Sequence, residues 1–195
     1  MARTVPDCAR LLEAIAGSDG WDDRQPAFGL EVGSPKTLFL DAVLDTIQKD
    51  SKSSLSGLKV GILREGFEVP HQDANVVASV QAAAQKFSQL GAQVQEVSVP
   101  AHHTVSSPPQ NLGDGSTKDR PLQGNALTPS IIYNTSPFDS TGHPALSLPC
   151  GFVPASDNPE IKLPTGIMLV GRRYDDVTIL KAAAAWEKAF DWKIL

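Results

Sequence analysis

The sequence predicts an α/β fold: a partial mixed β-sheet with a parallel βαβ unit and flanking helices. Three observations favour this class. One run reads strand, helix, strand; two later apolar segments can form further strands; and apolar residues recur at helical spacing around them. The chain has 195 residues, 41% of them hydrophobic and 20% charged, which is typical of a single globular domain.

The βαβ unit is predicted in the first half of the chain. Lys59 to Leu63 is an apolar run of the length of a buried strand. Asp73 to Leu90 carries apolar residues at helical spacing, and Gly91 can end that helix. Gln93 to Val99 then alternates between polar and apolar residues until Pro100. This order predicts a parallel strand pair with a right-handed crossover.

Three more helical or helix-like segments are predicted around this unit. Thr4 can cap a helix that runs to Ala16 before Gly17, with an apolar face formed by Cys8, Leu11, Leu12 and Ile15. Thr37 to Ile47 has a similar stripe. Asp175 or Asp176 begins the last helix, whose inner face is Ile179, Leu180, Ala183, Trp186 and Phe190.

A second strand pair is predicted near the C-terminus. Gly142-His143-Pro144 forces a turn, because the residue before a proline avoids the helical region. Ala145 to Leu148 is then a buried strand, and Gly166 to Val170 can pair with it in antiparallel fashion.

The connecting segments are polar. Residues 18–35 and Lys49 to Ser56 are predicted loops, and Ser51-Lys52-Ser53-Ser54 is expected to face water rather than to form a Ser–Lys catalytic pair. Residues 101–130 are predicted to be flexible, because Pro, Ser, Gly, Asn and Gln dominate and no periodicity survives. Such a long connection is unusual inside a compact domain.

Charge and cysteine usage limit the partners and the compartment. A net charge of −5 argues against nucleic acid or an anionic membrane as a partner. No apolar run approaches the roughly 20 residues that span a bilayer, and the N-terminus lacks a charged-then-apolar leader. Cys8 and Cys150 are expected to be thiols of a reducing compartment, so a cytoplasmic location is predicted.

Metal and nucleotide sites are not expected. The four histidines, His71, His102, His103 and His143, lack the partner spacing of a zinc site, and His102-His103 is predicted to be a solvent-facing pair. The turn after the first strand contains no Gly-x-Gly-x-x-Gly or Gly-Lys-Ser/Thr motif, so no nucleotide cofactor is expected.

The stretch Asn134-Thr-Ser-Pro-Phe-Asp-Ser-Thr-Gly-His-Pro-Ala-Leu-Ser-Leu-Pro-Cys-Gly151 closely resembles the C-terminal part of amidase signature enzymes. Three other segments also resemble this family: Met1-Ala-Arg-Thr-Val-Pro-Asp-Cys-Ala, Leu58-Lys-Val-Gly-Ile-Leu and Leu163-Pro-Thr-Gly-Ile-Met-Leu-Val-Gly-Arg-Arg-Tyr-Asp-Asp. The resemblance covers nearly the whole chain except residues 101–130. Family members carry a longer, largely helical region there, so this chain is expected to have lost that region, by deletion, by splicing or through an error in the gene model.

The resemblance implies hydrolysis of a small-molecule carboxamide to a carboxylate. In the family, a serine attacks the carbonyl, a second serine on a cis peptide relays its proton to a lysine, and backbone amides stabilise the oxyanion. These segments, including a Gly-Gly-Ser-Ser-Gly-Gly-Ser run, precede the segment equivalent to Met1. No catalytic residue can therefore be assigned to this chain. The resemblance does predict a wall of the substrate cleft, formed by Phe138, Asp139, Thr141, Gly142 and His143.

Two details of this wall are left open. Asp139 replaces the asparagine usual in the family, and its carboxylate could change the local field or pair with Arg172. Arg172 and Arg173 could bind a carboxylate, but a solvated or structural role at the end of the strand is favoured.

Three functional hypotheses follow. In the first, residues 1–195 are a partial amidase domain that is inactive alone and exposes strand edges. In the second, the chain is a non-catalytic, amidase-like binding protein. In the third, Cys150 and His143 form an independent hydrolytic dyad. The third is disfavoured, because a strand between them places the two side chains at its opposite ends. The sequence does not indicate the oligomeric state.

Overall fold

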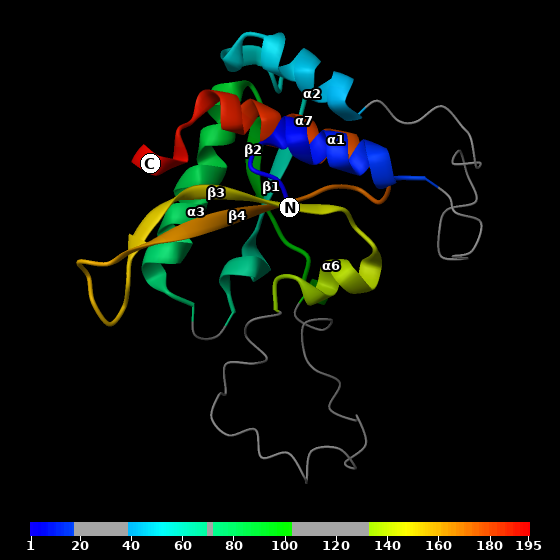
Figure 1. Cartoon of the computed structure of the whole chain (residues 1–195). Helices are drawn as coiled ribbons and strands as arrows, with labels where there is room; N and C mark the ends of the chain where they lie inside the picture. The colour runs from blue at the N-terminus through cyan, green and yellow to red at the C-terminus, as the bar shows by residue number, and fades with distance from the viewer. Residues whose placement is uncertain (18–38, 70–71, 103–132) are drawn as a thin grey trace.

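The computed structural model describes residues 1–17, 39–69, 72–102 and 133–195 (Figure 1). The described helices are α1 (Val5–Ile15), α2 (Phe39–Gln48), α3 (Ala74–Lys86), α6 (Ser136–Thr141) and α7 (Asp176–Ala189). The strands are β1 (Lys59–Leu63), β2 (Gln93–Val97), β3 (Ala145–Pro154) and β4 (Lys162–Val170). Most of the predicted loop at 18–35 and of the predicted flexible segment at 101–130 lies outside the described residues.

The predicted βαβ unit is confirmed. β1 and β2 pair in parallel, with Lys59 opposite Gln93 and Leu63 opposite Val97. Asp73 caps α3 by accepting hydrogen bonds from the N–H groups of Asn75 and Val76. β1 is half-buried rather than buried as predicted, because among the described residues only β2 pairs with it.

The predicted antiparallel pair is also confirmed, and it is longer than predicted. β3 and β4 pair from Ala145 opposite Val170 to Pro154 opposite Lys162, with a register shift between Pro149 and Gly151. Within the described residues, the strands of the expected mixed sheet form two separate two-stranded ladders, one parallel and one antiparallel (Figure 1).

The core forms where α7 meets α1, α2 and the β3–β4 pair. Figure 1 shows α1, α2 and α7 together on one side of this pair, with α6 on the other side. Trp186 of α7 is 2% exposed and stacks on Phe87, the two ring centroids lying 5.2 Å apart. Asp175 caps α7 by accepting a hydrogen bond from Thr178 N–H, which confirms one of the two predicted caps.

The predicted apolar face of α1 is only partly correct, although the helix and its Thr4 cap are confirmed. Leu12 packs against the core and Cys8 is half-buried. Leu11 is 47% exposed and Ile15 is 71% exposed, whereas the fully buried residues are Val5 and Ala9. The small Ala9 side chain allows close packing, and the Val5 N–H donates to the Glu187 carboxylate of α7 at 3.0 Å. Packing against α2 and α7 therefore buries a face of α1 that includes Val5 and Ala9 as well as Leu12.

The predicted polar linker at Lys49 to Ser56 is only partly correct. Leu55 and Ser54 are buried, and the Ser54 hydroxyl donates to the Ser51 carbonyl at 2.9 Å. Leu55 N–H donates to the Leu90 carbonyl at 2.9 Å, which ties this segment to the end of the α3 region.

Candidate functional site

The candidate site is a cavity of about 600 Å³ between the two strand pairs. Its long walls are apolar and come from β1, α3, β4 and α7, including Val60, Ile62, Val76, Val80, Ile167, Leu169, Ile179 and Ala182. Polar side chains gather at one end, next to α6. We call the residues Gly66, Gln72, His102, Asn134 and Phe138 the polar end of the cavity.

Hydrogen bonds hold the side chains of the polar end in place. The amide nitrogens of Gln72 and Asn134 both donate to the Gly66 carbonyl, at 2.7 and 3.1 Å. Asn134 Oδ1 lies 3.2 Å from His102 Nε2, so this ring nitrogen carries the proton that the amide oxygen accepts. Gln72 Oε1 is buried and has no hydrogen-bond partner among the described residues. A buried acceptor of this kind favours a ligand that brings an N–H or O–H donor.

α6 places an aromatic ring at this end. The helix ends at Gly142, whose φ of 67° is a left-handed conformation suited to glycine. The Phe138 ring lies 5.6 Å from the His102 ring and 6.3 Å from the His143 ring, measured between centroids. Thr141 Oγ1 donates to the Pro137 carbonyl at 2.8 Å and lies 2.7 Å from His143 Nδ1. Because a hydroxyl has one proton, His143 Nδ1–H is the donor of the second bond.

The five residues predicted for the cleft wall lie on α6 and just after it. Phe138 lines the cavity. Asp139, Thr141 and Gly142 are exposed on α6 and at its end, and His143 is half-buried against the Phe138 ring.

The two arginines after β4 are exposed. The Arg173 guanidinium lies over the Tyr174 ring, 5.1 Å from its centroid, and donates to the Tyr174 hydroxyl at 2.9 Å. This matches the favoured structural or solvated role. Among the described ion pairs, none joins Arg172 to Asp139.

The prediction of a solvent-facing His102 is wrong. Its side chain is 4% exposed, because Asn134 binds one ring nitrogen and Phe138 covers the ring. Both partners are more than 30 residues away in the sequence, so no local pattern around His102 indicated them. His103 lies outside the described residues.

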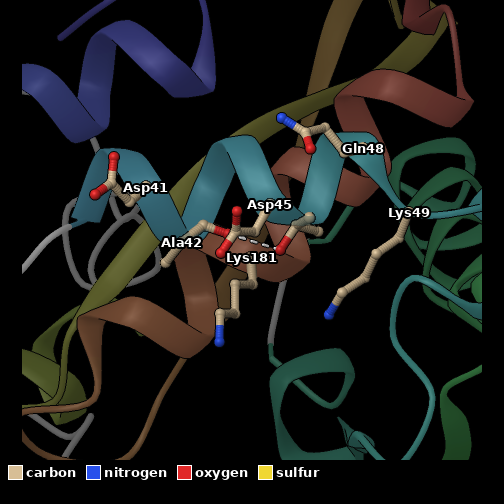
Figure 2. Close-up of a pocket in the computed structure, with 7 residues that line it drawn as sticks. Asp41, Ala42, Asp45, Gln48, Lys49 and Lys181 are labelled. Atoms are coloured by element: carbon tan, nitrogen blue, oxygen red, sulfur yellow. Dashed lines mark hydrogen bonds between the residues drawn. The ribbon is translucent and has the colours of Figure 1, made fainter.

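A second pocket of about 610 Å³ lies against α2 (Figure 2). Its lining residues are Asp41, Ala42, Asp45, Thr46, Gln48, Lys49 and Lys181. The Thr46 hydroxyl donates to the Ala42 carbonyl of its own helix at 2.8 Å. The pocket is open and its charged groups face solvent, so it offers no enclosed surface for a small ligand.

A family model described as Amidase matches residues 1–108. The chain belongs to the amidase family. Curated relatives include a glutamyl-tRNA(Gln) amidotransferase subunit of Synechococcus sp. (strain CC9605), which is 37% identical over 99 residues. That match covers 51% of this chain and 17% of the relative. The enantioselective amidase of Rhodococcus rhodochrous is 25% identical over an alignment of 288 positions. This alignment covers 97% of this chain and 52% of the relative.

Two solved structures confirm the amidase fold. A glutamyl-tRNA(Gln) amidotransferase subunit of Thermotoga maritima matches with a TM-score of 0.66 and 20% identity, over 96% of this chain and 51% of its own. A peptide amidase bound to chymostatin matches with a TM-score of 0.57 and 17% identity, over 96% and 53%. The amidase-family chain thus spans about half the length of the relatives that it matches over nearly all its residues.

The amidase-family chain does not form the Cys150–His143 dyad. Cys150 is 3% exposed, and its Sγ lies 3.5 Å from the Thr165 hydroxyl. His143 lies just before β3 begins and is held by Thr141, whereas Cys150 lies within the strand. Both cysteines are free thiols.

No helix in the described part of the chain is long and apolar enough to cross a bilayer. Within the same residues, no three His, Cys, Asp or Glu side chains are grouped so that they could hold a metal ion.

A buried carboxylate joins the ends of β1 and β2 beside the cavity. Glu65 is 1% exposed, and its carboxylate accepts hydrogen bonds from the Ser98 hydroxyl and from Val99 N–H. The pKa of Glu65 is lowered from 4.5 to about 2. The hydrogen bond from Ser98 is the largest cause, and the one from Val99 N–H is the next. A carboxylate whose pKa falls on folding stabilises the folded state above its unfolded pKa.

Glu65 is therefore expected to make the protein acid-sensitive. Its contribution should be complete above pH 4.5 and should be lost as the pH falls toward 2. We expect the urea midpoint of Glu65→Gln to fall less steeply over this interval than that of the wild type. The pKa of Asp7 and of Asp73 is also lowered, chiefly by hydrogen bonds with Thr4 and Ser156 respectively. Both groups are present in the wild type and in the variant, so their acid dependence cancels when the two urea curves are compared. Parallel curves for the two proteins would contradict the assignment.

Proposed function

We propose that this amidase-family chain forms one side of an amide-binding cleft at the polar end of the cavity. The observation that carries the proposal is Gln72 Oε1, which is buried, lines the same cavity as Phe138 and has no hydrogen-bond partner in the part of the chain that the structure describes. A primary carboxamide brings N–H donors that such an acceptor can bind. The names of two relatives, an enantioselective amidase and a peptide amidase, agree with an amide as the substrate class.

Three groups at the polar end have distinct tasks in this proposal. Gln72 Oε1 accepts a hydrogen bond from the carboxamide N–H, and the Gly66 carbonyl holds the Gln72 side chain in position. The Phe138 ring packs against the apolar part of the amide. The His143 ring supports Phe138 from outside the cavity and is itself held by Thr141.

Hydrolysis itself needs groups that this sequence does not contain. A serine hydroxyl is a weak nucleophile at neutral pH without a positioned base, and the oxyanion needs several N–H donors. The sequence segment most similar to the family's Gly-Gly-Ser-Ser-Gly-Gly-Ser run is Ala16-Gly-Ser-Asp-Gly20, which lacks its repeated glycine–serine pattern. The chain by itself is therefore proposed to be a partial amidase domain without activity, and its amide-binding wall works with a separate set of catalytic segments.

The test is an assay with benzamide as a simple carboxamide. The full chain alone should give no turnover. We call the part of the Rhodococcus rhodochrous amidase that this chain does not match the complementary half. The full chain is then either mixed with the complementary half or fused to its C-terminus. That pair should release ammonia, and Phe138→Ala should raise KM about tenfold or more by removing an aromatic contact.

Phe152→Ala is the matched control, because Phe152 lies outside the cavity and stacks on Trp192 at 5.3 Å. Its KM should equal that of the unmutated pair. Turnover by the chain alone would contradict the proposal, and so would equal KM values for the two variants. Benzamide binding without turnover by any pair would favour the non-catalytic binding protein instead.

A further inference from the structure

The turn between β4 and α7 contains a strained tyrosine. Asp175 N–H donates to the Arg172 carbonyl at 3.0 Å, so these residues enclose a tight four-residue turn. Tyr174, the third residue of this turn, has a φ of 64°, and no other non-glycine residue in the described ranges has a positive φ. Such a position normally takes glycine or asparagine, because a larger side chain raises the free energy of this conformation. A bulky residue held there points to a functional role for its side chain.

The strained tyrosine holds the side chain of Arg173. The guanidinium lies over the Tyr174 ring, 5.1 Å from its centroid, and donates to the Tyr174 hydroxyl at 2.9 Å. These contacts use one face of the guanidinium and one of its several N–H donors. Arg173 is exposed, so the remaining donors are accessible to a ligand. A guanidinium fixed by stacking can still bind a carboxylate through two parallel hydrogen bonds.

No carboxylate on the neighbouring elements neutralises Arg173. The Asp175 carboxylate caps α7 by accepting a hydrogen bond from Thr178 N–H at 3.2 Å. Asp139 on α6 and Asp176 at the start of α7 belong to none of the ion pairs that the structure describes, and neither does Arg173. The positive charge of Arg173 therefore remains available for an anionic group from outside the chain.

Arg173 lies at the rim of the proposed amide site. A Cβ on Gly142 would be 3.7 Å from Arg173 Nε, so the arginine packs over the end of α6. Gly142 belongs to the predicted cleft wall, and Phe138 of the same helix lines the cavity. Gly171 and Thr178, on either side of the strained turn, line the cavity too. The turn thus presents its arginine beside the cavity and outside its apolar walls.

We propose that Arg173 is a specificity-determining residue that binds a carboxylate on the amide substrate. The substrate class is then a carboxamide whose acyl part carries a second, ionised carboxyl group. The carboxamide lies at the polar end of the cavity, the carboxylate pairs with the Arg173 guanidinium at the rim, and Tyr174 holds that guanidinium in place. This inference rests on the proposed function, because the polar end must bind the carboxamide group.

Binding of 4-carbamoylbenzoate to the full chain tests the role of Arg173, with the methyl ester of the same compound as the uncharged probe. Calorimetry should give a Kd about tenfold lower for the acid than for the ester, because the acid adds a charge-assisted pair. Arg173→Gln should make the two Kd values equal and leave that of the ester unchanged. Arg172→Gln is the matched control: it removes the same charge from the adjacent exposed residue, so the preference for the acid should remain.

Tyr174→Gly tests whether the strain serves binding. Glycine adopts a positive φ without strain, so the Tm of this variant should equal or exceed that of the wild type. Its preference for the acid should fall to about threefold or less, because the guanidinium is no longer held by the ring. A lower Tm together with an unchanged preference would show that the ring serves the fold alone, and would overturn the role given to Tyr174.

The remaining outcomes separate this inference from the proposed function. Equal Kd values for acid and ester in the wild type overturn the inference, and so does a preference that both arginine variants lose equally. If the pair with the complementary half hydrolyses benzamide but the acid is not preferred, the proposed function stands and the inference fails. If Arg173→Gln alone abolishes the preference but no pair hydrolyses benzamide, the carboxylate site stands and the proposed hydrolysis fails.

Discussion

Replacing Trp186 by alanine is expected to lower the free energy of unfolding by about 3–5 kcal/mol, the largest loss of any single substitution considered. The indole is 2% exposed and lies between the rings of Phe87 and Phe190, with centroids at 5.2 and 4.7 Å. Its Nε1–H donates to the Pro149 carbonyl at 3.3 Å. The substitution leaves a cavity where α7 meets the end of the α3 region and β3, and it removes a donor from that carbonyl.

The measurement is urea unfolding at pH 7, with Trp192→Ala as the control. Trp192 is only half-buried and stacks on the single ring of Phe152 at 5.3 Å. Its loss should cost about 1 kcal/mol. Equal losses for the two tryptophans would mean that the core does not centre on α7.

Gly91→Ala is expected to destabilise the protein by about 2–4 kcal/mol, because two separate costs add. Gly91 has a φ of +90°, which side-chain-bearing residues rarely adopt. A Cβ at this position would lie 2.9 Å from the Lys52 carbonyl oxygen and 3.0 Å from Ser56 Oγ. The glycine therefore sets both the end of the α3 region and its close approach to the segment before β1.

Gly57→Ala separates these two costs. Gly57 has a similar φ of +86°, but a Cβ there would meet nothing within 4 Å. It should lose only the conformational part, about 1 kcal/mol. Thermal unfolding of both variants gives the comparison. If Gly91→Ala were no more destabilising than Gly57→Ala, the close approach to Lys52 would not be a constraint.

Elements whose signals are local were predicted well. The predicted caps at Thr4 and Asp175 bind N–H groups three residues away, so the signal and its partner lie within the same few residues. Gly91 ends a helix for an equally local reason. The strand pairs followed from short apolar runs and from the order of elements.

Predictions that depended on distant partners failed or were missed. The burial of His102 depends on Asn134 and Phe138, which are more than 30 residues away. The buried face of α1 depends on packing against α2 and α7. None of these pairs leaves a repeating signal in the sequence around either residue.

The amino-acid sequence alone located most of the helices and strands, though not α6 or the full length of β3, and indicated the family to which the chain belongs. Capping bonds, apolar periodicity and family motifs are properties of neighbouring residues, so one sequence is enough to find them. Only the tertiary structure decided that two strand pairs remain apart around one cavity, with polar side chains at one end of it. The physical reason is that such a cavity forms between segments far apart in the chain, whose contacts depend on packing rather than on local pattern.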